Sequence, residues 1–149
     1  MSKQDPATIG YHIDPAEGTV QHVMMRAREG RNYLKHLYAL CDCDLVTTAY
    51  LDNGTDDAVF VDDEGLLKAM SPFDFFALSE QHESLKGPGV VMGRDAHGNS
   101  TSPATSWEAF KASGVARVLL FKRPGDTRIQ YLYKSFQFID AIREAGDDE

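Results

Sequence analysis

The sequence predicts an α+β fold in which a mainly antiparallel sheet is built from hairpins and accompanied by about three helices. Short apolar stretches are joined in pairs by turn residues more often than they alternate with helical segments, which favours hairpins over strand-helix-strand units. Apolar residues recur at helical spacing in only a few windows. No segment repeats at a fixed period and no low-complexity linker divides the chain, so we expect a single domain over residues 1–149.

The first sixty residues predict two hairpins with a helix between them. Residues 11–25, "YHIDPAEGTVQHVMM", contain a short apolar stretch, a turn with proline and glycine, and a second alternating stretch. Residues 44–61 predict another hairpin, because β-branched and aromatic stretches flank the turn residues "DNGT". Spacing of i, i+3, i+4 and i+7 predicts a helix from Asn32, whose apolar face is Leu34, Leu37, Tyr38 and Cys41.

The middle of the chain predicts two short strands and a short helix. Residues 71–81, "SPFDFFALSEQ", begin like a helix, with serine followed by proline and an aspartate, but then alternate like a strand, which is the prediction we favour. "GPGVVMG" at residues 87–93 is an apolar stretch between glycines. The composition of residues 94–103 is typical of a loop. Thr105 stands three residues before Glu108, which is the spacing of a capping box, so we expect a helix to begin there.

The last part of the chain predicts the clearest hairpin and a closing helix. The apolar stretches of residues 115–134 flank "RPGD", in which Pro124 and Gly125 suit the middle positions of a type II turn. In residues 135–146 the spacing of apolar residues is helical, and a glycine ends the segment. The residues with this spacing are Phe138, Ile139 and Ile142.

Residues 50–65, "YLDNGTDDAVFVDDEG", are rich in carboxylates, which could form an acidic site or mark turns. A calcium loop counted from Asp52 needs glycine at its sixth position and glutamate at its twelfth, but these positions are Asp57 and Asp63. The carboxylates lie at both ends of a short strand, so more than about 10 Å separates them. We therefore predict structural turns, and the turn residues are Asp62, Asp63, Glu64 and Gly65.

The two cysteines, Cys41 and Cys43, are separated by one residue and are poorly placed to bond each other, so we interpret them as reduced thiols. A structural zinc site needs four ligands, and there is no second cysteine pair. The five histidines form no metal or nucleophile motif, although His12 and His22 could face each other across the first hairpin. We therefore predict no metal and no cofactor, and an enzyme, a small hydrolase or a nucleotide-binding one, is the least favoured hypothesis.

Charge is unevenly distributed along this acidic chain. A net charge of -8 argues against general affinity for phosphate backbones. However, residues 26–36 carry +3 and contain one tyrosine between the cations, and residues 117–134 carry +4 and contain two. Cations next to aromatic rings suit a protein partner or single-stranded nucleic acid. The residues predicted to bind a partner are Arg117, Lys122, Arg123, Arg128, Tyr131, Tyr133 and Lys134.

Four stretches carry a family resemblance: "YHIDP", "DAVFVDDEGLL", the pair Phe75 and Phe76, and "LKGPGVVMGRDAHGNSTSP". Over about residues 10 to 103 they resemble a family of small proteins of unknown function found on bacteriophages, plasmids and related mobile elements. The last stretch contains a "G-x-D-x-x-G" loop, whose turn residues are Gly93, Asp95 and Gly98. The resemblance implies a bacterial or phage cytoplasm and an accessory role, and it names no activity. Residues 104–149 depart from the pattern and suggest an added helix, hairpin and helix.

Location and function follow from these observations as expectations. The polar start "MSKQDPATIG" lacks the apolar segment of a signal peptide, and no apolar run approaches the roughly 18 residues of a spanning helix, so we expect a cytoplasmic protein with no membrane contact. The leading hypothesis is a non-enzymatic accessory protein of a mobile element that binds a host or phage protein. The alternative is a nucleic-acid-binding accessory protein. The sequence leaves the partner and the oligomeric state open.

Overall fold

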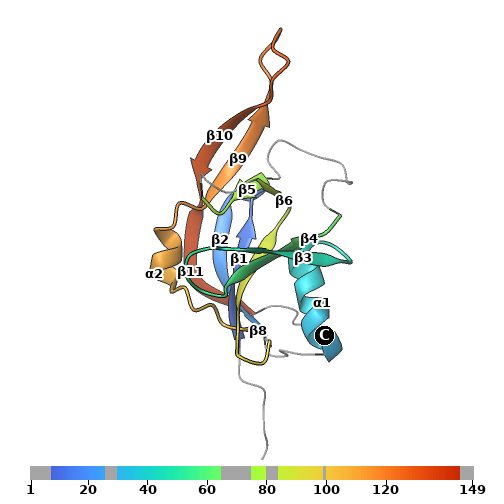
Figure 1. The fold of residues 1–149 in the computed structure, drawn as a ribbon, viewed down its shortest axis with the longest axis vertical. Helices are drawn as coiled ribbons and strands as arrows, with labels where there is room; N and C mark the ends of the chain where they lie inside the picture. The colour runs from blue at the N-terminus through green and yellow to red at the C-terminus, as the bar shows by residue number, and fades with distance from the viewer. Residues whose placement is uncertain (1–7, 26–29, 65–74, 80–83, 99, 145–149) are drawn as a thin grey trace, which may run out of the picture.

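The computed structural model describes residues 8–25, 30–64, 75–79, 84–98 and 100–144 (Figure 1). The described part of the fold is mostly β, because it contains eleven strands and few helical residues. The described residues contain two helices, α1 (Gly30–Cys41) and α2 (Trp107–Lys111), of which the second has only five residues. The predicted α+β class with about three helices is therefore wrong. The helix expected at the end of the chain is a strand.

The larger sheet has seven strands in the order β11-β2-β1-β7-β4-β3, with β8 paired to β7. β1 pairs with β2, and β3 with β4, so both predicted hairpins are confirmed. β7 lies between β1 and β4 and joins the hairpins into one sheet. Within this sheet the described pairs are antiparallel except β11 with β2, which is parallel. The strands are β1 (Thr8–Asp14), β2 (Thr19–Met25), β3 (Val46–Tyr50), β4 (Ala58–Asp62), β7 (Gly89–Arg94), β8 (Ser100–Thr101) and β11 (Gln137–Glu144).

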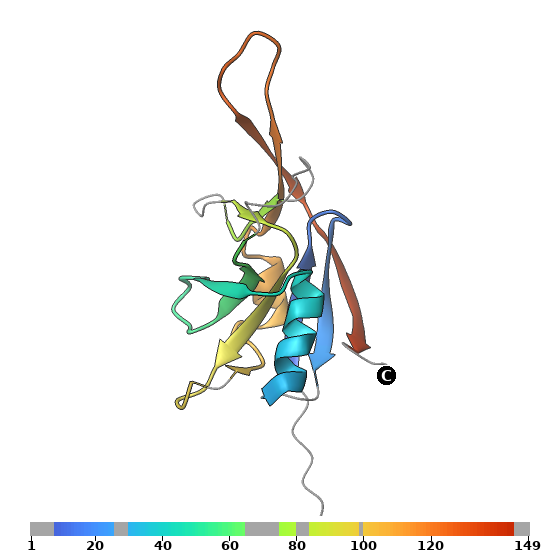
Figure 2. The same cartoon turned by 90° about the vertical axis from the view of Figure 1, so that its right-hand side faces the viewer.

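The smaller sheet has four antiparallel strands in the order β10-β9-β5-β6. β9 and β10 form the predicted C-terminal hairpin. β5 pairs with β9 only over residues 116–118, so among the described strands the rest of β9 pairs with β10 alone. Figures 1 and 2 show these two strands and their connection projecting from the body of the molecule. The strands are β5 (Phe75–Ala77), β6 (Leu85–Lys86), β9 (Ala116–Phe121) and β10 (Gln130–Ser135).

β11 occupies the segment that was predicted as the closing helix. Phe136 and Phe138 are two residues apart, the period of a strand; Phe136 is buried and Phe138 packs against the same core cluster. The amide of Gln137 donates to the carbonyl of Gly18 at 2.9 Å, next to the start of β2. β11 then follows β2, with a register shift after Ile139. Pairing with β2 and burial of the phenylalanines therefore outweigh the helical spacing in the sequence.

The helices pack on the larger sheet. α1 confirms the first predicted helix, and Leu37 and Cys41 on its apolar face are buried against β2 and β7. α2 begins one residue later than the capping-box pattern predicted. Its N-cap is Ser106, whose Oγ accepts a hydrogen bond from the amide of Ala109 at 3.1 Å, while Thr105 is buried. The predicted capping box at Thr105 is therefore wrong.

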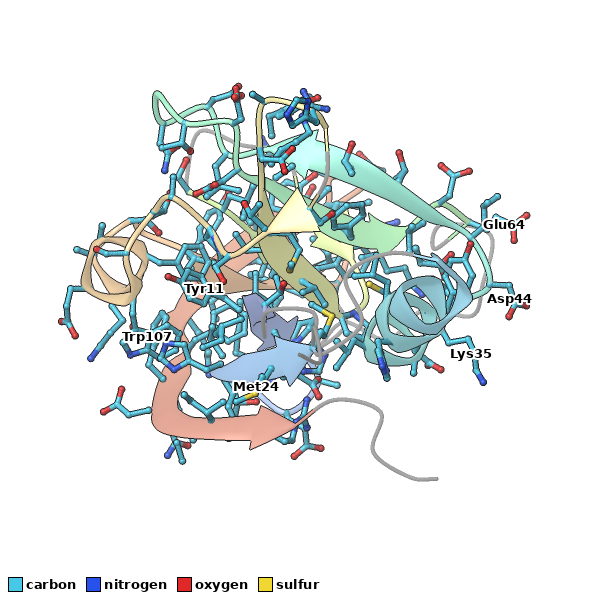
Figure 3. All side chains as sticks on the ribbon, turned by 90° about the horizontal axis from the view of Figure 1, so that it is seen from below. Tyr11, Met24, Lys35, Asp44, Glu64 and Trp107 are labelled. Carbon is cyan, nitrogen blue, oxygen red and sulfur yellow. The ribbon has the colours of Figure 1, made fainter. Side chains whose placement is uncertain are left out.

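An aromatic cluster holds α2 against the sheet. Figure 3 shows Tyr11 and Trp107 side by side, and their ring centroids are 5.3 Å apart. The ring centroids of Trp107 and His22 are 3.9 Å apart, and the indole N–H of Trp107 donates to Asp140 Oδ1 at 2.8 Å. Trp107 therefore contacts β1 and β2 and bonds to β11. Aromatic pairs of this kind contribute about 0.5–1.5 kcal/mol beyond the area that they bury.

Candidate functional site

The surface with the most exposed apolar side chains is residues 119–134, which we call the ribbon. Eight large apolar side chains are exposed among the described residues, and five of them lie here. They are Phe121, Ile129, Tyr131, Leu132 and Tyr133. Tyr131 is the most exposed, at 55%. The ribbon is therefore an apolar projection that the rest of the described chain does not cover.

Both faces of the ribbon carry apolar side chains. Along β10 the side chains alternate, so Tyr131 and Tyr133 lie on one face and Leu132 on the other. Phe121 pairs with Gln130 across the ribbon and therefore shares the face of Leu132. A strand with one solvated face normally alternates apolar and polar residues. Gln130 and Lys134 accompany Leu132 on its face, but neither face of this ribbon is polar throughout.

The ribbon is also positively charged. It contains the cations Lys122, Arg123, Arg128 and Lys134 and one carboxylate, Asp126, which gives +3. Since the whole chain carries -8, the remainder carries -11. The ribbon and the body therefore have opposite charge.

The connection at the tip of the ribbon is ordered by Asp126. Its amide donates to the carbonyl of Arg123 at 3.0 Å, and Gly125 has a φ of +83°, which is the predicted type II turn. Asp126 Oδ1 accepts the Arg128 amide at 2.9 Å, and Oδ2 accepts Gln130 Nε2 at 3.2 Å. The pKa of Asp126 lies below its ordinary value, mainly because the carboxylate accepts a hydrogen bond from the Arg128 amide. A hydrogen bond from the Arg128 side chain has the second largest effect.

Six of the seven residues predicted to bind a partner lie on the ribbon, and Arg117 lies at its base. The Arg117 side chain turns toward the connection between β1 and β2, where Nε donates to the carbonyl of Pro15 at 2.9 Å and Nη2 to that of Ala16 at 3.4 Å. Arg117 therefore links the smaller sheet to the first hairpin. The sequence reading missed Phe121, Ile129 and Leu132, although "TRIQYLYK" lacks the apolar-polar alternation of a half-buried strand.

The acidic stretch places its carboxylates in different surroundings. Asp62 Oδ1 accepts the amide of Glu64 at 2.9 Å, and the amide of Asp63 donates to the carbonyl of Leu45 at 2.8 Å. These contacts lie at the end of β4, and Gly65 lies outside the described residues. Figure 3 shows Glu64 pointing away from the body, beside α1. Asp62 and Glu64 therefore bond locally, whereas the amide of Asp63 bonds to the residue that precedes β3.

Asp57 differs from the other carboxylates of this stretch because its side chain is buried. The sequence did not single this residue out. Only 1% of its surface is exposed, and its two oxygens accept the amides of Ala104 at 2.9 Å and Thr105 at 2.7 Å. The carbonyl of Thr105 in turn accepts the Tyr11 hydroxyl at 2.7 Å. Burial raises the pKa of Tyr11, and the Asp57 charge raises it further, so the hydroxyl stays a donor. Asp57 therefore fixes the chain that leads into α2.

The "G-x-D-x-x-G" loop follows β7. Gly93 is buried, and a Cβ atom there would lie 2.6 Å from the carbonyl oxygen of Ser102. Asp95 Oδ1 accepts the amide of His97 at 2.9 Å, and Gly98 has a φ of +83°. The loop therefore needs glycine at position 93 for close approach and at position 98 for backbone conformation.

A polar hollow of about 320 Å³ lies between this loop and the acidic stretch. Thr55, Arg94, Thr101 and Ser102 are among the residues that line it. Asp57 is part of the wall, but both of its oxygens accept backbone amides. The described residues contain no group of three or more His, Cys, Asp or Glu side chains that could hold a metal ion.

The cysteines and histidines do not converge. Cys41 is buried, and its thiol donates to the carbonyl of Phe60 at 3.3 Å, while Cys43 is half-buried. Burial raises the pKa of Cys41, and Cys43 and Asp62 raise it further by smaller amounts. His12 pairs with Gln21 and His22 with Tyr11, so the two histidines lie on opposite faces of the first hairpin and do not face each other. That interpretation is therefore wrong.

The comparisons with known proteins give no family. The chain matches no family model, and neither the curated proteins nor the solved structures contain a match. In the described part of the chain, neither helix has the length and apolar character required to cross a membrane.

Proposed function

We propose that this chain is a non-enzymatic binding protein that engages a protein partner through the ribbon. The observation that carries the proposal is the exposure of five large apolar side chains, four on the two strands and one on their connection, with both faces open. Burying apolar surface contributes about 25 cal/mol per Å². Contiguous apolar patches on otherwise polar surfaces mark interaction sites. The ribbon is therefore the surface that gains most from a partner.

The side chains of the ribbon favour a protein over a nucleic acid. Phe121, Ile129 and Leu132 offer apolar contact but no hydrogen bond to phosphates or base edges, whereas tyrosine and arginine are frequent in the energetic centres of protein interfaces. The surrounding cations suit an acidic rim on the partner. Nucleic acid is the second candidate, because a two-stranded ribbon fits the major groove and the cations and tyrosines suit phosphates and bases.

The cellular setting belongs to the same proposal. The stretches within residues 10–103 support an accessory protein of a mobile element that acts in a bacterial or phage-infected cytoplasm. The candidate partners are then proteins of the host or of the phage. The structure adds a requirement for such a partner: it should combine an apolar groove or sheet edge with acidic residues around it.

The proposal is tested with Tyr131→Ser and the matched control Tyr50→Ser. Both tyrosines are exposed, at 55% and 47%, but Tyr50 lies on β3 in the larger sheet. The two variants and the parent chain are immobilised, and the proteins that they retain from a nuclease-treated host lysate are quantified by mass spectrometry. Loss of one tyrosine anchor should lower retention of the true partner about tenfold or more in Tyr131→Ser and leave it unchanged in Tyr50→Ser.

Equal retention by the parent and Tyr131→Ser would contradict the proposal. The nucleic-acid candidate is measured separately with labelled single strands and duplexes. Binding at low salt that weakens steeply as salt is added would favour that candidate instead.

A further inference from the structure

We propose that two copies of this chain pair through the outer edges of their β10 strands, so that the two smaller sheets form one continuous sheet across a twofold axis. The inference goes beyond the proposed function and does not depend on it. It starts from the position of β10. This strand lies at the edge of the smaller sheet, and among the described strands it pairs only with β9. Its outer edge therefore faces no described strand.

An apolar edge strand of this kind is normally protected or paired. Residues 131–135 are all exposed, and β10 extends along a ribbon that β5 supports only at its base. Isolated two-stranded ribbons are marginally stable in water. Edges with unpaired amides and carbonyls readily accept another strand. Pairing with a second copy would satisfy this edge and add two strands of support to each ribbon.

The sequence of β10 is self-complementary about Leu132. In an antiparallel pair centred on this residue, Leu132 faces Leu132 of the second copy, and Tyr131 faces Tyr133 of the second copy. The twofold axis repeats the tyrosine pair, so four tyrosines lie together on one face. Aromatic pairs and leucine pairs are among the cross-strand contacts that stabilise sheets. Closed twofold dimers are also the commonest protein assemblies.

The charges fit the same register. Lys134 faces Gln130 of the second copy in this arrangement. Gln130 Nε2 donates to Asp126 Oδ2 at 3.2 Å, so the Asp126 carboxylate lies next to the position that Lys134 of the second copy would reach. The axis forms this contact twice. Each ribbon carries +3, and Asp126 already pairs with Arg128 of its own ribbon at 3.4 Å. The register adds Lys134 of the second copy beside the same carboxylate.

The register is tested by disulfide formation in the full chain with Cys43→Ser as background, since Cys41 is buried. Leu132→Cys should form a disulfide-linked dimer on mild oxidation. Thr127→Cys, exposed in the connection of the ribbon, should do so at least about tenfold more slowly, because cysteines bridge only when their Cα atoms are within about 7 Å. Tyr131→Cys and Tyr133→Cys should form a disulfide with each other when mixed. Alone, each should bridge poorly, since like positions would be roughly 8 Å apart.

Association is measured by sedimentation. The parent should sediment as a dimer at micromolar concentration. Leu132→Lys should weaken the dimer about tenfold, because the cross-strand leucine pair is lost and two cations then face each other. Leu132→Lys should melt cooperatively, since Leu132 lies outside the core clusters.

Three results would overturn the inference: a monomeric parent at about 100 μM, a dimer unaffected by Leu132→Lys, or equal disulfide formation at positions 132 and 127. Partner retention is a separate measurement, so failure of the dimer leaves the proposed function tested on its own result.

Discussion

Removing the buried carboxylate of Asp57 should destabilise the chain far more than removing its exposed neighbour. Asp57 and Asp56 are adjacent, and their carboxyl groups are chemically identical. Asp57 is 1% exposed and accepts two backbone amides, whereas Asp56 is exposed. Asp57→Ala deprives the amides of Ala104 and Thr105 of their acceptors. The contrast isolates the structural role from the acidic charge of the stretch.

The magnitude follows from the two hydrogen bonds. The hydrogen bond from Thr105 is buried, and a buried amide that loses its acceptor costs about 1–3 kcal/mol. The hydrogen bond from Ala104 is only partly buried and contributes less, so we expect a loss of about 2–4 kcal/mol for Asp57→Ala. Asp57→Asn keeps one acceptor oxygen but turns an NH₂ group toward the second amide, so we expect about 1.5–3 kcal/mol. A domain of this size has a total stability of about 5–15 kcal/mol. Asp57→Ala should therefore remove a large part of the stability of the chain.

Urea unfolding of the parent, Asp57→Ala, Asp57→Asn and Asp56→Ala measures these differences. Asp56→Ala should stay within about 0.5 kcal/mol of the parent, as expected for a surface substitution. If Asp57→Ala is too unstable to purify, the comparison of Asp57→Asn with Asp56→Asn gives the same test. An Asp57 variant as stable as its Asp56 counterpart would refute the role of the two hydrogen bonds.

Three further predictions concern other parts of the body. Gly93→Ala should cost about 2–3 kcal/mol in urea unfolding, because its Cβ would clash with a carbonyl, whereas Gly98→Ala, in open space at positive φ, should cost about 1 kcal/mol. Burial lowers the pKa of His12 below 6.5, so as the pH falls the unfolded state binds a proton before the folded state does, and stability should fall below about pH 6.5. His12→Gln should reduce this dependence of stability on pH, and an unchanged dependence would contradict the role of His12. Iodoacetamide should label Cys43 well before Cys41, whose thiol is buried with a raised pKa, and equal labelling in the native protein would contradict this.

Local patterns predicted the hairpins but not the end of the chain. Turn residues between alternating stretches are short-range signals, and the pairs β1 with β2, β3 with β4 and β9 with β10 follow them. β11 depends on a strand far away in the sequence, because it pairs with β2. The helical spacing of Phe138, Ile139 and Ile142 predicted a helix, but pairing with the edge of β2 favours a strand. The period-two spacing of Phe136 and Phe138 was the available signal.

Six of the seven residues that the sequence predicted to bind a partner lie on the ribbon, and their binding role stays a prediction. Cations and tyrosines located the ribbon, but its apolar character depends on the absence of a covering element, which no local pattern reports. Arg117 shared the pattern of the other cations, and only the fold shows that its guanidinium bonds the first hairpin. Asp57 is similar, because its partners Ala104 and Thr105 are nearly fifty residues away. Burial and distant hydrogen bonds are products of the tertiary fold.

The most direct test of the ribbon as a binding surface is photo-cross-linking in host cells. A benzophenone amino acid replaces Tyr131 in one sample and Tyr50 in another, so that an exposed aromatic group is exchanged at two sites in different sheets. We expect position 131 to form an adduct with another protein and position 50 to form none, while adducts of the chain with itself report the paired ribbons. No adduct from position 131, or the same adducts from both positions, would contradict the account.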